Sequence, residues 1–122
     1  MALARMTVIG FRVALVVTLV VTMYLATTQQ NFAVIDDAND KVKHILAFYV
    51  LAFLADYSTP NIRFNLNKGL LVLAYGLLIE VIQYFLPYRE CSLFDLAADG
   101  FGIATYVLSL PVLGRITILR DR

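Results

Sequence analysis

Charged residues are scarce in this chain of 122 residues, at 16% of the total, whereas a soluble domain carries about 25%. Cys91 is the only cysteine, which excludes an intrachain disulfide and a cysteine-based zinc site. The ten Lys and Arg residues form no cluster interleaved with aromatic residues, so we expect no nucleic-acid partner. Because hydrophobic residues reach 61% and come in long runs, the composition indicates a membrane protein that spans the bilayer several times.

Four apolar segments dominate the sequence, and each approaches the roughly 17–25 residues that cross a bilayer as a helix. They cover residues 11–28, 42–57, 69–86 and 93–113. Polar, turn-like stretches separate them. We therefore predict an all-α fold, a transmembrane bundle of four helices that forms a single domain over residues 1–122. The small-x-small pattern of a signal-peptide cleavage site is poorly matched after the first segment, so we expect that segment to be retained.

The distribution of Lys and Arg predicts how the helices are oriented. Seven of these residues fall at the amino end, in the loop between the second and third segments, and in the carboxyl tail. The opposite side has three, namely Lys41, Lys43 and Arg89. Because cytoplasmic loops carry an excess of basic residues, we expect both termini to be cytoplasmic and the loop around Pro87 to face outward.

A few polar residues interrupt or flank the apolar segments. An ionised side chain at bilayer depth costs about 2.5–3.5 kcal/mol on insertion scales, so such residues are paired or functional. The six that stand out are His44, Glu80, Gln83, Arg89, Asp95 and Asp99.

Helical geometry places these residues at similar depth. The cytoplasmic edges of the last three helices are taken at Asp56, Lys68 and Arg115. At about 1.5 Å per residue, His44 and Glu80 both lie about 18 Å from these edges, and Asp99 about 24 Å. Glu80 and Gln83 share one helix face, as do Asp95 and Asp99. Ala98 and Gly102 form a small-xxx-small pair that allows close helix approach. We expect these polar residues to converge near the outer membrane face.

The residue types in this cluster suggest two kinds of role. His44, Glu80 and Asp99 are the predicted catalytic acid/base group, because imidazole and carboxyl groups can exchange protons near neutral pH. The predicted ligand-binding residues are Lys41, Gln83, Arg89 and Asp95. Among them, the guanidinium of Arg89 suits a phosphate or a carboxylate.

We predict no cofactor and no metal, since one histidine without an HExxH motif makes a zinc site weak. A hard divalent ion that bridges to a phosphate stays open as an alternative.

Three blocks of sequence resemble those of VanZ-like proteins. The first is Asn39-Asp40-Lys41-Val42-Lys43-His44, followed by Phe48. The second, residues 80–89, is similar to an E-x-x-Q-x-x-x-P-x-R block. The third covers residues 92–102 and has Asp99 where the family commonly has Asn. The resemblance covers residues 36–110. It implies a multi-pass protein of the bacterial cytoplasmic membrane, and the family is named for an accessory protein of glycopeptide resistance, linked to teicoplanin.

Three functions remain open. The first is a cell-envelope protein that binds, and in one version modifies, an anionic lipid or lipid-linked cell-wall precursor from the outer side. The second is a non-enzymatic accessory subunit whose charged cluster is structural, with a second copy or another membrane protein as partner. The third is a proton or ion transporter, which needs a polar route through the whole membrane. Membrane lipids are expected partners in all three, and whether the chain is an enzyme stays open.

Overall fold

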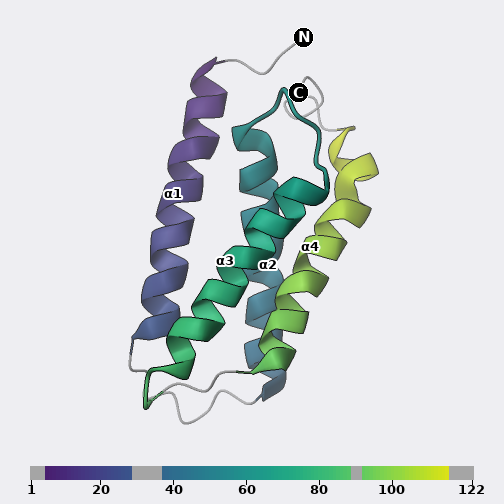
Figure 1. Cartoon of the computed structure of the whole chain (residues 1–122). Coiled ribbons are helices and arrows are strands. Elements are labelled where there is room, and N and C mark those ends of the chain that lie inside the picture. Colours follow the sequence, from purple (N-terminus) through teal and green to yellow (C-terminus); the bar gives the residue numbers. More distant parts are fainter. Residues whose placement is uncertain (1–4, 29–36, 89–91, 116–122) are drawn as a thin grey trace.

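The computed structural model describes residues 5–28, 37–88 and 92–115, and these form four helices with no strand among them. The helices are α1 (Arg5–Thr27), α2 (Asp37–Ser58), α3 (Leu66–Tyr84) and α4 (Leu93–Leu113). They run up and down in chain order (Figure 1). The predicted all-α bundle of four helices is confirmed. Three of the helices, α1, α3 and α4, are long and apolar enough to cross a membrane.

The two ends of the bundle differ in what they connect. The α2–α3 end carries the turn between Ser58 and Leu66, together with the start of α1 and the end of α4 (Figure 1). The α3–α4 end carries the end of α1, the start of α2 and the passage from α3 to α4. This up-and-down topology places the start of α1 and the end of α4 at the same end of the bundle.

The predicted helix boundaries shift by a few residues because of local capping. Asn65 caps α3, where its side-chain oxygen accepts a hydrogen bond from the Lys68 N–H at 2.9 Å, so the helix begins at Leu66 rather than at 69. Ser92 caps α4 in the same way through the Phe94 N–H, at 3.2 Å. Helix α1 begins earlier than predicted, at Arg5.

Helix α2 occupies the centre of the bundle. It packs against each of the other three helices. Its residues Phe48, Leu51 and Ala52 are fully buried at the core, against Ile79 and Tyr106 among others. Five charged residues lie in α2, and it is absent from the set of helices apolar enough to span a membrane alone. A polar helix of this kind is stable in a bilayer only when its neighbours enclose it.

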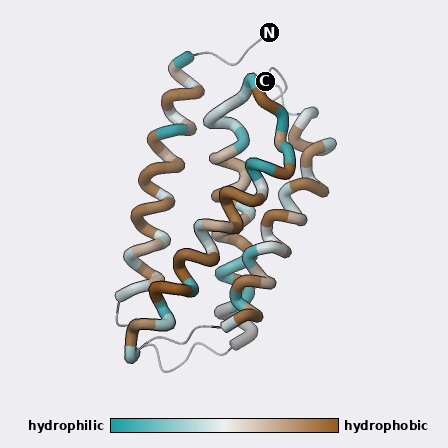
Figure 2. Tube along the Cα trace, in the orientation of Figure 1, coloured by the Kyte–Doolittle hydropathy of each residue, from teal (hydrophilic) through white to brown (hydrophobic). Residues whose placement is uncertain are grey.

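The outer helix faces are apolar. Helix α1 has no buried residue, and Val13, Val16 and Val20 are each more than half exposed. Hydrophobic colours run along most of α1 in Figure 2. An apolar face of this length fits contact with lipid chains.

Two helices approach closely at Gly102. A Cβ atom at this position would overlap the backbone carbonyl oxygen of Ile45 in α2 and lie 3.1 Å from the Phe48 Cβ. The small residue therefore sets the distance between α2 and α4, as the Ala98–Gly102 pair predicts. Gly100, two residues earlier, has only Leu73 near its open side, at 3.9 Å.

We expect Gly102→Ala to lower the free energy of unfolding by about 1–3 kcal/mol, because the new methyl group meets backbone that cannot move away cheaply. Gly100→Ala is the matched control in the same helix, and it should leave stability unchanged or slightly higher. Unfolding in mixed detergent micelles, followed by circular dichroism, measures both variants. Equal stability of the two variants would contradict the close approach.

Candidate functional site

The structure brings His44, Glu80 and Asp99 together from three different helices. One ligand-capable nitrogen or oxygen of each residue lies within 4.8 Å of those of the other two. His44 is in α2, Glu80 near the end of α3 and Asp99 near the start of α4. The group therefore lies toward the α3–α4 end of the bundle, inside the apolar segments. These are the three residues that the sequence predicts as an acid/base group.

His44 and Asp99 form the closest pair in this group. The His44 Nδ1 lies 2.6 Å from the Asp99 Oδ1, and the Asp99 side chain is only 1% exposed. In the tautomer that carries its proton on Nδ1, the ring donates this hydrogen bond to Asp99. Nε2 is then directed to other groups, and it lies 3.9 Å from the Asp95 Oδ2. The contact with Asp99 thus orients the imidazole ring.

Lys41 and Asp95 form an ion pair at the outer edge of the same group. The Lys41 Nζ contacts the Asp95 Oδ1, and the Lys41 side chain is 30% exposed against 7% for Asp95. Asp95 lies in the first turn of α4, where a negative charge is favoured by the unpaired N–H groups of the helix start. The pair therefore joins α2 to the amino end of α4.

Glu80 connects the end of α3 to the start of α4 through a hydrogen bond. Its Oε2 accepts a hydrogen bond from the backbone N–H of Ser92 at 3.0 Å, and the residue is 4% exposed. Ser92 is the N-cap of α4. A buried carboxylate that also holds a helix start has little freedom to rotate, so its position relative to Asp99 is set by the fold.

Gln83 lies on the same face of α3 as Glu80 but contacts a different helix. Its Nε2 donates to the backbone oxygen of Ala26 near the end of α1, at 3.0 Å. The residue is 3% exposed, and its Oε1 accepts no hydrogen bond from the residues that the structure describes. The predicted ligand-binding residue Arg89 lies outside the described residues.

Sequence reasoning missed the part played by Gly76. A Cβ atom at Gly76 would lie 2.6 Å from the Asp99 Oδ2 and 3.0 Å from the Phe48 ring. Glycine at this position in α3 therefore makes the room in which the Asp99 carboxylate lies. The spacing of four residues between Gly76 and Glu80, which puts both on one helix face, is the pattern that could have indicated it.

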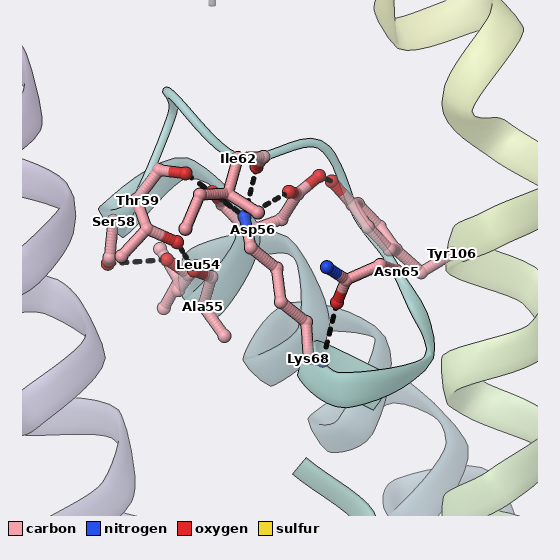
Figure 3. A network of polar contacts seen from close by, with 9 residues as sticks. All are labelled: Leu54, Ala55, Asp56, Ser58, Thr59, Ile62, Asn65, Lys68 and Tyr106. Atoms are coloured by element: carbon pink, nitrogen blue, oxygen red, sulfur yellow. Dashed lines mark hydrogen bonds and ion pairs between the residues drawn. The ribbon is translucent and has the colours of Figure 1, made fainter. Parts of the chain in front are cut away.

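A second polar cluster lies near the α2–α3 end (Figure 3). Asp56 is fully buried, and its two carboxylate oxygens contact different partners: Oδ1 the Lys68 Nζ at 2.9 Å, and Oδ2 the Tyr106 hydroxyl at 2.5 Å. The sequence marks Asp56 and Lys68 only as helix edges. The structure shows that they form an ion pair between α2 and α3, and that Tyr106 of α4 contacts the same carboxylate.

Lys68 also binds the end of α2 and the turn that follows. Its Nζ donates to the backbone oxygens of Asp56 at 3.1 Å, Thr59 at 3.0 Å and Ile62 at 2.5 Å. Carbonyls at the end of a helix lack partners within the helix, so one ammonium group satisfies several of them at once. The positive charge of Lys68 and the negative charge of Asp56 neutralise each other inside the protein, which is typical of a structural role.

An apolar layer separates the two clusters. His44 and Asp56 are twelve residues apart in α2, which corresponds to about 18 Å along the helix. The fully buried residues between them in α2 are Phe48, Leu51 and Ala52. The polar groups therefore form two separate clusters in α2; Tyr49, between them in sequence, turns its hydroxyl to Ser109 in α4 at 2.8 Å.

The comparison with protein families agrees with the resemblance of the three sequence blocks. The model of the VanZ/LLP1 family matches residues 3–114. The chain belongs to the VanZ/LLP1 family. Both clusters fall inside the matched range, as do all four helices. Neither the curated proteins nor the solved structures gave a match to this chain. Family membership and the three membrane-spanning helices together establish a membrane protein of VanZ type.

We expect Lys68→Met to lower the free energy of unfolding by about 3–5 kcal/mol, because it leaves the buried Asp56 carboxylate without its cation. Tyr106→Phe removes one hydrogen bond to the same carboxylate and should lower stability by about 1–3 kcal/mol. Lys43→Met is the matched control, since Lys43 is exposed on α2. Denaturation in detergent measures all three. A Lys68→Met variant as stable as the control would contradict the structural assignment of this cluster.

Proposed function

We propose that this protein binds a phosphate-bearing anionic lipid, or a lipid-linked cell-wall precursor, in the His44 cluster at the α3–α4 end. The observation that carries the proposal is the graded exposure of the cluster. The groups able to carry positive charge are the more exposed ones, with Lys41 at 30% and His44 at 16%. The carboxylates of Asp95 and Asp99 lie deeper, at 7% and 1%. An anion that approaches from the membrane surface meets the cations first.

The membrane orientation in this proposal follows from the sequence. The excess of Lys and Arg on the other side predicts that the α2–α3 end faces the cytoplasm. The His44 cluster then opens toward the outer leaflet of the bacterial cytoplasmic membrane. Headgroup phosphates of that leaflet, and the pyrophosphate of an outward-facing lipid-linked precursor, lie beyond the hydrocarbon core, on the side of the cluster where Lys41 is most exposed.

His44 is the residue best placed to act on a bound phosphate. With Nδ1 hydrogen-bonded to Asp99, its Nε2 is the ring atom that can donate or accept a proton at a ligand oxygen. Binding is the proposed activity, and proton transfer by the His44–Asp99 pair is the catalytic version of the same hypothesis. The apolar layer of α2 between the two clusters disfavours the transporter alternative, which needs a continuous polar route.

Lys41 provides the sharpest test of binding. We expect Lys41→Gln to weaken binding of phosphatidylglycerol and of a polyprenyl-pyrophosphate precursor about 10–100-fold, because a charge-assisted hydrogen bond contributes about 1.5–3 kcal/mol. Native mass spectrometry of the detergent-solubilised protein, with zwitterionic phosphatidylcholine as reference lipid, measures the affinities.

Two matched variants separate ligand binding from folding. Lys43→Gln removes the same charge from an exposed position two residues away and should bind as the parent does. Lys41→Arg keeps the charge opposite Asp95 and should recover most of the affinity. Equal binding of anionic and zwitterionic lipids by the parent would refute the proposal and favour the accessory-subunit alternative.

A further inference from the structure

We infer that His44, Glu80 and Asp99 form a binding site for one divalent transition-metal cation. This departs from the expectation of no metal that the sequence alone suggested. The site itself rests on the geometry of these three residues. Its use as a bridge to a phosphate rests on the proposed function. The sequence left open a divalent ion that bridges to a phosphate, and these three residues are the ligands such an ion would have.

The ligand atoms are already gathered. Neighbouring ligands of one ion at bond lengths near 2.1 Å lie about 3–4 Å apart. The chosen nitrogen and oxygen atoms of His44, Glu80 and Asp99 lie within 4.8 Å of one another. This separation is slightly larger than that of ligands on one ion, so the ligand atoms draw closer together when the ion binds. Because each ligand comes from a different helix, the fold rather than a local sequence motif assembles the set.

The surrounding residues hold two of the ligands in place. The Glu80 carboxylate is held by the Ser92 N–H at 3.0 Å. The Asp99 carboxylate lies in the room left by Gly76, where a Cβ would come within 2.6 Å of Oδ2. Metal sites need this kind of outer support, because loosely held ligands bind weakly.

Gln83 carries a buried amide oxygen one turn beyond Glu80, although its hydrogen bond is to α1 and not to the three ligands. Gln83 is on the same face of α3, is 97% buried, and its Oε1 accepts no hydrogen bond within the described part of the chain. Its Nε2 is held by the Ala26 carbonyl, which fixes the amide so that its oxygen points away from that contact. An amide oxygen is a donor that hard cations accept.

The donor set indicates the class of cation. One imidazole nitrogen suits zinc and other first-row transition metals, and two carboxylates suit manganese. An all-oxygen ion such as Ca²⁺ gains nothing from the imidazole. Mn²⁺ and Zn²⁺ are therefore the probes, with Ca²⁺ as the contrasting ion.

A bound cation would change the charge at the base of the site and so favour the phosphate binding of the proposed function. Glu80 and Asp99 are both at most 4% exposed, and like charges repel an approaching phosphate. A divalent ion held by these two carboxylates cancels their charge at the base of the site and removes that repulsion. Its open coordination positions then accept phosphate oxygens, while Lys41 contacts the ligand from the rim. With the ion bound, His44 is a ligand and no longer transfers a proton, so the ion replaces the catalytic version of the proposed function.

The test uses full-length protein in detergent after treatment with EDTA. We expect about one Mn²⁺ or Zn²⁺ per chain by elemental analysis after desalting, and little Ca²⁺. Pulsed electron paramagnetic resonance of the Mn²⁺ complex should show ¹⁴N modulation from the imidazole. His44→Gln should abolish that modulation, and Glu80→Gln should weaken Mn²⁺ binding at least about tenfold.

Asp56→Asn is the matched control, because it makes the same kind of change in the buried carboxylate of the other cluster. It should leave Mn²⁺ binding unchanged. Absence of stoichiometric metal, or absence of ¹⁴N modulation in the parent, overturns the inference. So does an Asp56→Asn variant that loses metal to the same degree as Glu80→Gln. The spectrum of the parent decides the matter even where a variant does not fold.

A lipid titration with and without EDTA separates this inference from the proposed function. We expect EDTA to weaken binding of phosphatidylglycerol, and Mn²⁺ to restore it. Stoichiometric metal with no preference for anionic lipid would refute the proposed function and leave the metal site standing. Anionic lipid binding that EDTA does not change would refute the bridging role alone.

Discussion

The polar groups of α2 must be shielded from lipid, and the packing of the other helices follows from this. Asp56 lies near the end of α2 and His44 two turns from its start, and a bilayer tolerates such groups only when protein surrounds them. The other three helices pack against it and turn apolar faces outward, as the exposed valines of α1 show. Gly102 lets α4 come close enough to exclude lipid from the α2 backbone at Ile45. The bundle therefore buries one face of its most polar helix, while Val42, Leu46 and Val50 on α2 stay exposed.

The two polar clusters contain similar chemical groups but differ in their roles. Around Asp56, the carboxylate oxygens contact Lys68 and Tyr106, and Lys68 binds three backbone carbonyls as well (Figure 3). Its charges are matched inside the protein, and the cluster ties α2, α3 and α4 at one end. The His44 cluster has more carboxylates, and its cationic groups lie toward the surface. The structural interpretation of buried charge fits the first cluster, and the ligand-binding interpretation fits the second.

The sequence predicted the number of helices and the meeting of His44, Glu80 and Asp99, because depth and helical spacing both follow from a fixed rise per residue. It could not predict that Gln83 contacts α1, since the rotation of α3 depends on how its side chains pack. It also missed the pair of Asp56 and Lys68. Charged residues at a helix end have the same pattern in sequence whether they face water or each other. The start of α2 at Asp37 was missed for a related reason, since hydropathy marks where a helix is apolar rather than where it begins.

The position of Asp99 links packing to chemistry. Its carboxylate is buried against α3 only because residue 76 is glycine, and its Oδ1 contacts the one histidine of the chain. The carboxylate adds a negative charge at a depth where charge is costly, so this chain must balance it with a proton, a cationic side chain or a metal ion. Of these, the metal ion alone also supplies open coordination positions for a phosphate.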